Sequence, residues 1–500
     1  MTDPSALRNP DYVIIGGGTA GLVVACRLSE DPTQHMLVLE SGLDRINDTR
    51  VQDPFAWESL TGSDLDWNFK MAPQIGVNNR QFNHSAGKLL GGTSMINASI
   101  FVPPSPAEID AWGSIGNPDW NWDTLLPYLQ KTYTLDSSAR GSQSLGLKLP
   151  HPPAAIRVSY SVPQGKPDLS LLEAWKRAFQ ERGYEHTDDL LAETSTLGTR
   201  PLAATIDSET GQRSSAASEY GTILSTRSNV TILTGVTARR ILFDSPEADQ
   251  SATATGVEFE VILAAGAFHT PKILELSGIG DKGRLDRLGI HLVSNLPGVG
   301  KNLQSHFMGI VTASLKTGTD IDSISPGYKA LAFVRLPDNQ IQELLSKSHA
   351  PMDPRYFEIR GNTHITTADP IDPPSMDPRF LTNDLDLEFL VGHVEQLEEV
   401  LSSPSLQPFF QARPTTDRES LRRLLKESIG MPSAHPCGTA AMRPRDTGGV
   451  VDQDLKVYGT ANVRVVDASV FPLIPHANPI ATVYAVAERA ADLIQSSRSA

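Results

Sequence analysis

Residues 16–21 (GGGTAG), near the start of the chain, have the types and spacing that bind a phosphate-bearing cofactor, because they fit the pattern GxGxxG. Gly16 permits a tight turn, Gly18 lets the backbone approach a pyrophosphate, and Gly21 lets a helix pack closely on a strand. The N-terminus of that helix offers oriented N–H groups to the anion. The residues predicted to form this dinucleotide site are Gly16, Gly18, Thr19, Ala20 and Gly21.

Two strands and a helix have to position these glycines. Residues 12–15 (YVII) are typical of a buried parallel strand, residues 22–31 (LVVACRLSED) have a helical pattern, and residues 36–40 (MLVLE) predict a second strand. The second strand ends at Glu40, whose carboxylate can accept hydrogen bonds from ribose hydroxyls. An acid at this position argues against the 2′-phosphate of NADP, but it does not separate NAD from FAD.

Two further glycine-rich segments are more specific. Residues 87–97 (GKLLGGTSMIN) end in the polar Asn97. Residues 261–280 (VILAAGAFHTPKILELSGIG) predict a buried strand, a turn, and a helix. That helix is expected to open at Thr270 and Pro271, in the N-cap and N1 positions, and to end near residue 277. Taken singly, each segment is a strand–turn–helix element of an α/β fold.

Together these segments resemble the glucose-methanol-choline (GMC) family of FAD oxidoreductases. The two segments match the two family signatures, and residues 435–494 match the closing segment of the family. The resemblance extends from about residue 10 to residue 495. It implies an α/β (α+β) fold with a Rossmann-like FAD-binding domain assembled from discontinuous segments. It also implies a substrate domain with an antiparallel sheet flanked by helices. The implied bounds are 1–306 for the FAD-binding domain, completed by 430–500, and 307–429 for the substrate domain.

Alcohol oxidation needs a base for the hydroxyl proton and a hydride acceptor beside it. Histidine suits the base role because its pKa lies near the working pH. The resemblance places the catalytic histidine at His435 and a second residue, His or Asn, about forty positions downstream. Counting from the flanking residues favours Asn478 for this second position and leaves His476 as the alternative. Asn can hydrogen-bond a substrate oxygen but cannot act as a base.

The resemblance also implies cofactor contacts from residues spread over the chain. Those on the isoalloxazine side and the ribityl chain are Gly91, Gly92, Thr93, Ser94 and Asn97. Those elsewhere are Val236 at the adenine, Asp467 and Ala468 at the pyrophosphate and ribityl oxygens, and Pro479 and Ile480 near the pyrimidine edge. Some family members carry a covalent flavin link near the position of His84, but we expect a non-covalent FAD here.

The composition excludes several other classes of function. A formal net charge of −15 argues against nucleic acid as a partner, because phosphate backbones require clustered Lys and Arg. The two cysteines cannot build a disulfide framework, and no metal site is expected. No apolar run reaches the length of a membrane span, and the sequence shows no signal peptide, so we expect a cytoplasmic protein. The sequence leaves the oligomeric state open.

The sequence departs from the family in one stretch. Glu260 joins Val261 directly, where the family usually has a β-hairpin, and this loss predicts weaker FAD binding. The resemblance implies oxidation of a primary or aryl alcohol, with biosynthetic intermediates among the candidates, to an aldehyde or ketone. O₂ or a quinone would accept the electrons. Two alternatives remain: a non-redox member of the family (a hydroxynitrile lyase or a photodecarboxylase) and a binding protein without FAD.

Overall fold

The computed structural model describes most of the chain. The described residues are 10–136, 155–160, 169–188, 190–191, 196–244, 251–254, 260–318, 330–347, 361–412, 415–476 and 478–499. None of the helices in these ranges combines the length and apolar character that a membrane crossing requires.

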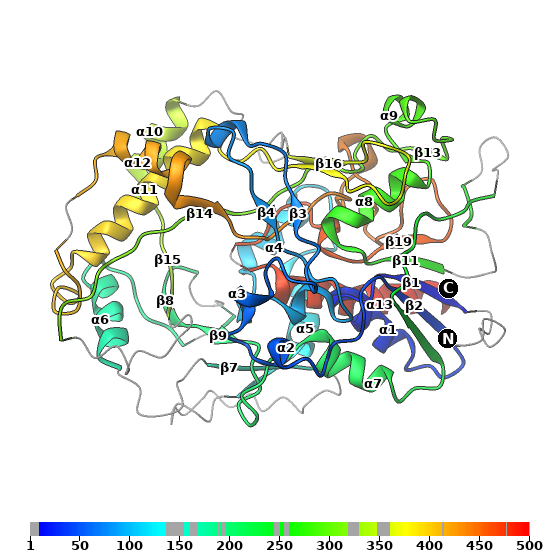
Figure 1. Cartoon of the computed structure of the whole chain (residues 1–500), viewed down its shortest axis with the longest axis horizontal. Helices are drawn as coiled ribbons and strands as arrows, with labels where there is room; N and C mark the ends of the chain where they lie inside the picture. Colours follow the sequence, from blue (N-terminus) through cyan, green and yellow to red (C-terminus); the bar gives the residue numbers. More distant parts are fainter. Residues whose placement is uncertain are drawn as a thin grey trace.

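A five-stranded sheet, parallel throughout, forms one end of the molecule (Figure 1). Its strands in spatial order are β10 (Val230–Thr234), β2 (Met36–Glu40), β1 (Tyr12–Ile15), β11 (Glu260–Leu263) and β19 (Val463–Val465). Such sheets are buried on both faces, which is why their strands are rich in Val, Ile and Leu. The predicted strands at 12–15 and 36–40 are confirmed. The sheet joins segments from both ends of the chain, as a discontinuous Rossmann-like domain requires.

Helices pack against this sheet, and others lie in the rest of the molecule. The last helix, α13, contacts α1 and α5, and its apolar stripe lies in the core. The helices are α1 (Thr19–Leu28), α2 (Thr49–Gln52), α3 (Trp57–Leu60), α4 (Pro106–Ser114), α5 (Trp122–Lys131), α6 (Leu169–Gln180), α7 (Thr222–Leu224), α8 (Gly266–Leu276), α9 (Lys282–Arg287), α10 (Asp338–Lys347), α11 (Asp384–Leu401), α12 (Arg418–Leu424) and α13 (Ile480–Ser499).

The expected start of α8 is wrong. The helix begins at Gly266, with Ala265 as its N-cap, and Pro271 lies inside it. A proline within a helix removes the N–H that would bond the carbonyl four residues earlier. Here that carbonyl belongs to Ala267, and the hydroxyl of Thr439 donates to it at 2.6 Å. A side chain from a distant segment therefore satisfies the acceptor that Pro271 leaves unpaired. The C-terminus agrees with expectation, since Ser277 is the C-cap.

The opposite end of the molecule carries α6, α10, α11 and α12 beside short strands (Figure 1). A four-stranded sheet has the order β5 (Ile100–Phe101), β9 (Ala203–Ala204), β7 (Ile156–Tyr160) and β6 (Tyr133–Asp136), antiparallel except between β7 and β6. The antiparallel pairs are β3 (Phe69–Lys70) with β4 (Asn83–His84), β8 (Gly198–Pro201) with β15 (Ala330–Phe333), β14 (Phe307–Gly309) with β18 (Gly430–Pro432), and β16 (Asn362–His364) with β17 (Ser375–Asp377). The parallel pair is β12 (Ile279–Gly280) with β13 (Ser294–Asn295).

The predicted substrate segment, 307–429, begins and ends at neighbouring strands. Antiparallel pairing of β14 with β18 brings residues 307–309 against residues 430–432. The same part of the molecule also receives β8 from the N-terminal half, which pairs with β15. The division at residues 306 and 430 stays a prediction. Residues 255–259, which precede the shortened junction at Glu260, lie outside the described residues.

Candidate active site

The predicted cofactor residues gather at the carboxyl ends of the parallel strands, where open α/β sheets bind ligands. Gly16 follows β1, Glu40 ends β2, and Asp467 follows β19. Gly266, which was not among the predicted cofactor residues, follows β11 at the same edge. Val236, which is exposed, follows β10, and its backbone N–H donates to the carbonyl of Glu40 at 3.0 Å. One edge of the sheet therefore collects residues that end or follow all five of its strands.

The three motif glycines differ in what surrounds them. Gly16 has a φ of +109°, and a Cβ there would lie 2.4 Å from the carbonyl oxygen of Ala264. A Cβ on Gly21 would lie 2.0 Å from the carbonyl oxygen of Gly16. At both positions a larger residue would collide with a backbone carbonyl, so glycine is required even without a bound cofactor. A Cβ on Gly18 would meet just the Cα of Gly92, at 3.8 Å. Gly18 therefore has an open side, which is what the approach of a pyrophosphate needs.

Glu40 is buried with both carboxylate oxygens hydrogen-bonded. The N–H of Gly17 donates to Oε2 at 2.9 Å, and the N–H of Gly42 donates to Oε1 at 2.7 Å. Burial raises the pKa of Glu40, and the N–H groups of Gly42, Gly17 and Ser41 oppose that rise. Each carboxylate oxygen has a second lone pair. Glu40 can therefore hold the glycine turn and still accept a bond from a ribose hydroxyl.

The 91–97 segment packs onto the glycine turn. The N–H of Gly91 donates to the carbonyl of Gly17 at 2.7 Å, and a Cβ on Gly92 would lie 2.9 Å from the Cα of Gly18. The side chain of Thr93 is exposed, whereas the hydroxyl of Ser94 donates inward to the carbonyl of Gly91. The Ser94 hydroxyl also accepts the N–H of Ala216 at 3.1 Å, so this side chain holds the loop in place.

Asn97 is fixed by a residue that the sequence argument did not assign. Arg213 is buried, and its Nη1 donates to both the carbonyl oxygen and Oδ1 of Asn97, at 2.6 and 2.8 Å. Burial lowers the pKa of Arg213 to about 10. Nothing in the surrounding sequence, residues 206–220, marked this arginine as the partner of Asn97.

Asp467 joins two of the predicted segments. Its Oδ2 accepts bonds from the N–H of Gly266 at 2.9 Å and from the hydroxyl of Thr270 at 2.6 Å. Burial raises the pKa of Asp467, and these donors together with Ser469 oppose the rise. The carbonyl of the next residue, Ala468, accepts the N–H of Gly438 at 3.1 Å. This network ties the start of α8 to the loop that carries His435.

His435 lies in the loop after β18, with Asn478 against one ring nitrogen. The Nδ2 atom of Asn478 is 3.0 Å from His435 Nε2. On the other side of the ring, His435 Nδ1 lies 3.0 Å from Nδ1 of His306 and 3.1 Å from Oγ of Ser433. Burial lowers the pKa of His435 to about 3, with smaller contributions from His306 and His84. The ring is therefore neutral at ordinary pH, and it carries a lone pair.

His476 has a different partner. Its backbone N–H and its Nδ1 both bond to the carboxylate of Glu108, and its ring meets Phe333 edge-on with centroids 4.4 Å apart. Burial disfavours ionisation of Glu108, but the bonds from His476 and Ser105 outweigh it and lower the pKa of Glu108. The structure thus brings Asn478, rather than His476, to His435. Pro479 and Ile480 follow at the start of α13, both half-buried.

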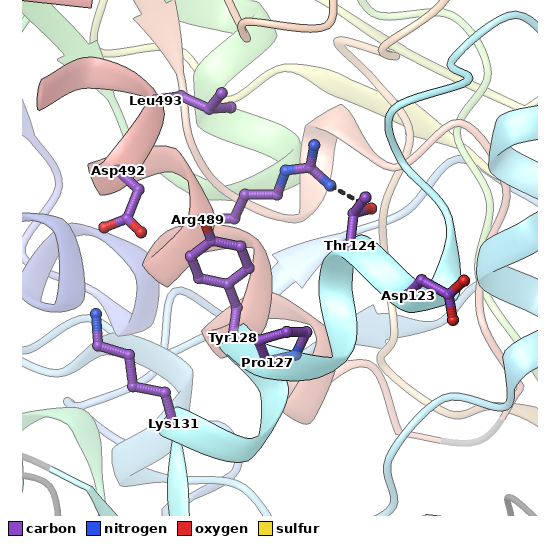
Figure 2. Close-up of a pocket in the computed structure, with 8 residues that line it drawn as sticks. All are labelled: Asp123, Thr124, Pro127, Tyr128, Lys131, Arg489, Asp492 and Leu493. Atoms are coloured by element: carbon purple, nitrogen blue, oxygen red, sulfur yellow. Dashed lines mark hydrogen bonds between the residues drawn. The ribbon is translucent and has the colours of Figure 1, made fainter. Parts of the chain in front are cut away.

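A separate cleft of about 530 Å³ lies between α5 and α13, and its lining contains none of the predicted site residues (Figure 2). Arg489 of α13 crosses it to donate to the hydroxyl of Thr124 at 2.8 Å. Its other lining residues are Asp123, Pro127, Tyr128, Lys131, Asp492 and Leu493. The candidate active site is therefore the group of hydrogen-bonded residues around His435 and the glycine turn, and this cleft is not part of it.

Comparison with known families agrees with the geometry. A family model described as GMC oxidoreductase matches residues 10–308, and a second model of the same description matches residues 358–487. The chain belongs to the GMC oxidoreductase family. Members of this family are FAD-dependent flavoproteins, and FAD is the cofactor of this GMC oxidoreductase.

Three relatives show how far the similarity to this GMC oxidoreductase extends. The glucose oxidase-like protein fsoC of Humicola fuscoatra is 32% identical, over 98% of this chain and 96% of that protein. An FAD-dependent oxidoreductase from Chaetomium thermophilum has a TM-score of 0.84 at 28% identity, over 98% and 100% of the two chains. A fungal aryl-alcohol oxidase has a TM-score of 0.79 at 27% identity, over 99% and 100%.

The described residues of this GMC oxidoreductase fit FAD. The open side of Gly18 is one indication of a bound cofactor. His84 is a second, because it is buried and neither of its ring nitrogens has a hydrogen-bond partner among the described residues. Burial lowers the pKa of His84 to about 4. An unpaired buried polar group is costly, so polar atoms of a bound ligand would relieve it. No group of three or more His, Cys, Asp or Glu residues in the described ranges is arranged to hold a metal.

Proposed function

We propose that this protein oxidises an alcohol, primary or aryl, to the corresponding aldehyde or ketone. The observation that carries the proposal is the 3.0 Å contact between His435 Nε2 and Asn478 Nδ2. A neutral imidazole and a neutral amide donor therefore lie side by side. The loop of His435 is hydrogen-bonded to Ala468, next to the predicted cofactor residue Asp467, and Asn478 directly precedes the predicted cofactor residue Pro479. A single substrate oxygen can meet both groups at once.

In this proposal, the substrate hydroxyl takes the place of the direct bond between Asn478 and His435. Its proton passes to His435 Nε2, which becomes an imidazolium. The amide N–H of Asn478 donates to the substrate oxygen while negative charge develops on it, as donors in oxyanion sites do. Bound FAD would supply the acceptor for the hydride of the alcohol carbon, and O₂ or a quinone would then take up the two electrons. The oxygen–carbon bond becomes a carbonyl.

The similarity to a fungal aryl-alcohol oxidase supports an alcohol with a primary or benzylic carbon. The similarity to a glucose oxidase-like fungal protein supports the same reaction class. These relatives favour CH–OH oxidation over a reaction without net redox change. The roles of His435 and Asn478, and those of the cofactor residues, are part of this proposal.

Anaerobic flavin reduction tests the proposal directly. The purified protein, loaded with FAD and mixed under argon with a panel of primary, secondary and aryl alcohols, should lose its yellow colour with at least one of them. His435→Ala should slow that reduction by several orders of magnitude, because general-base catalysis alone contributes roughly 10²–10⁴-fold. Cyanide or CO₂ release without bleaching would favour the non-redox alternatives, and near-normal reduction by the variant would remove His435 as the base.

A further inference from the structure

His306 lies against the proposed base because two strands pair there. Antiparallel pairing joins Phe307 of β14 to Pro432 of β18, and the next step of the register brings His306 opposite Ser433. The N–H of Ser433 donates to the carbonyl of His306 at 3.1 Å. Two residues before His306 and four residues after Ser433, an antiparallel bridge between Gln304 and Cys437 joins the same pair of segments again. The loop that carries His435 is therefore joined to the segment of His306 on both sides of His435.

The bonds of Ser433 decide which nitrogen of His435 carries the proton. The single hydrogen of the Ser433 hydroxyl goes to the carbonyl of His306, at 3.0 Å. The hydroxyl oxygen therefore presents a lone pair to His435 Nδ1, 3.1 Å away. A lone pair requires a donor opposite it, so His435 Nδ1 carries hydrogen.

Asn478 leads to the same tautomer from the other side of the ring. Its Nδ2 is a donor with no lone pair to offer, and it lies 3.0 Å from His435 Nε2. His435 Nε2 is therefore the acceptor. With hydrogen on His435 Nδ1, the Nδ1 of His306 at 3.0 Å must accept, and the hydrogen of His306 lies on its Nε2. Both flanks of the ring require the same arrangement.

We propose that His306 is a positioning residue for His435. Together with Ser433 it accepts the Nδ1–H of His435, which keeps the Nε2 lone pair of His435 directed at the substrate hydroxyl. The inference rests on the proposed function for its catalytic meaning, but the tautomer itself is a property of the resting protein.

The surroundings keep His306 able to accept. Burial lowers the pKa of His306 to about 4, with His476 lowering it further and Glu108 opposing. A neutral His306 does not repel a positive charge on His435. Among the described residues, the other side chain whose charge would lower the pKa of His435 is His84, itself neutral at ordinary pH because of burial. When His435 Nε2 takes the substrate proton, its Nδ1–H bond to His306 becomes charge-assisted and stronger. His306 thereby stabilises the imidazolium.

Nitrogen NMR of ¹⁵N-histidine-labelled holoprotein, without substrate, tests the tautomer. The His435 signals are assigned from their loss in His435→Gln. In the wild-type protein Nδ1 should have a protonated shift and Nε2 an unprotonated one. His306→Phe, combined with Ser433→Ala, removes both acceptors of the Nδ1–H, and the amide of Asn478 can turn to present Oδ1 to an Nε2–H. The double variant should therefore convert His435 to a mixture of tautomers. An Nε2–H tautomer in the wild-type protein overturns the proposal without any variant, and so does an unchanged tautomer in the double variant.

Kinetics separate positioning from a merely structural role. His306→Phe should lower the anaerobic flavin-reduction rate about 10–100-fold, while half-saturation by the alcohol changes by less than about threefold. His306→Asn, whose side-chain oxygen can accept near the position of Nδ1, should restore most of the rate. The flavin absorbance spectrum of each variant checks the fold. A His306→Phe rate equal to wild type, or no rescue by Asn, contradicts the proposal.

The two levels of the inference fail differently. If no alcohol reduces the wild-type flavin, the proposed function fails, and the NMR measurement still decides the role of His306 in the tautomer. A different result is that alcohols reduce the wild-type flavin and His435 has the stated tautomer, but His306→Phe leaves the reduction rate unchanged. The proposed function then stands, and the positioning role of His306 is wrong.

Discussion

The side-chain amide of Asn478 lies 3.0 Å from His435 Nε2, where it would meet the oxygen that the base deprotonates. A hydrogen bond to a developing charge is worth about 1.5–3 kcal/mol. We therefore expect Asn478→Ala to slow flavin reduction about 10–100-fold. Asn478→His keeps an N–H donor, so it should slow flavin reduction less than Asn478→Ala does. His476→Ala is the matched control, because His476 bonds to Glu108 and not to His435. A larger loss in His476→Ala than in Asn478→Ala would reverse the assignment.

Glu40 also acts at the scale of a single residue, through both carboxylate oxygens. Glu40→Gln keeps one acceptor oxygen but turns an NH₂ group toward the N–H of either Gly17 or Gly42. Donor facing donor should shift the glycine turn and remove an acceptor for the ribose. We expect the dissociation constant for FAD to rise about 10–100-fold, equivalent to about 1.4–2.7 kcal/mol. Fluorescence titration of deflavinated protein measures it, with exposed Glu58→Gln as the control. Unchanged affinity in Glu40→Gln would remove the carboxylate from the cofactor site.

At the scale of elements, α8 contains a proline whose missing N–H is compensated by Thr439. Thr439→Val leaves the buried carbonyl of Ala267 unpaired and should lower the free energy of unfolding by about 1–3 kcal/mol. Pro271→Ala restores the N–H that can bond this carbonyl within the helix. The Thr439→Val substitution should therefore lower the free energy of unfolding by less when Pro271→Ala is also present. Urea unfolding of the four proteins gives the coupling, and additive costs would show that the two residues do not share one acceptor.

Local patterns predicted the elements whose formation depends on local chemistry. Strands β1 and β2 have the predicted bounds because apolar β-branched runs bounded by turns specify buried strands. The start of α8 was missed because Pro at N1 is the commoner arrangement, and only the distant Thr439 makes an interior Pro271 acceptable. The contact of His306 with His435, 129 residues apart, depends on the pairing of β14 with β18. No local pattern encodes that pairing.

The candidate site shows the same division between local motif and long-range contact. The glycine turn at residues 16–21 and the loop of His435 could be found as motifs. The partners that orient them could not, because Arg213 on Asn97 and Glu108 on His476 are ordinary side chains until the fold brings them close. Family resemblance supplies positions, and the structure supplies hydrogen-bond partners.

At the scale of the whole molecule, folding buries several histidines in the neutral form. Burial is the main cause that lowers the pKa of His84 and His306 to about 4, and of His269 and His435 to about 3. The unfolded chain has histidine pKa values near 6.5. Between about pH 6.5 and pH 4 the unfolded state therefore binds protons that the folded state does not. Each such histidine lowers the free energy of unfolding by up to about 1.4 kcal/mol per pH unit as the pH falls.

We expect the urea midpoint of the holoprotein to fall steadily from pH 7 to pH 4.5. Buried carboxyls with a raised pKa, such as Asp467, oppose this fall, so the histidine contribution is isolated by substitution. His269 packs edge-on against Trp67 and Phe69 and is not one of the proposed catalytic residues. His269→Gln should reduce the dependence of the midpoint on pH, whereas exposed His291→Gln should leave it unchanged. Equal slopes in wild type and His269→Gln would mean that His269 is protonated in the folded protein, and burial would then not hold its ring neutral.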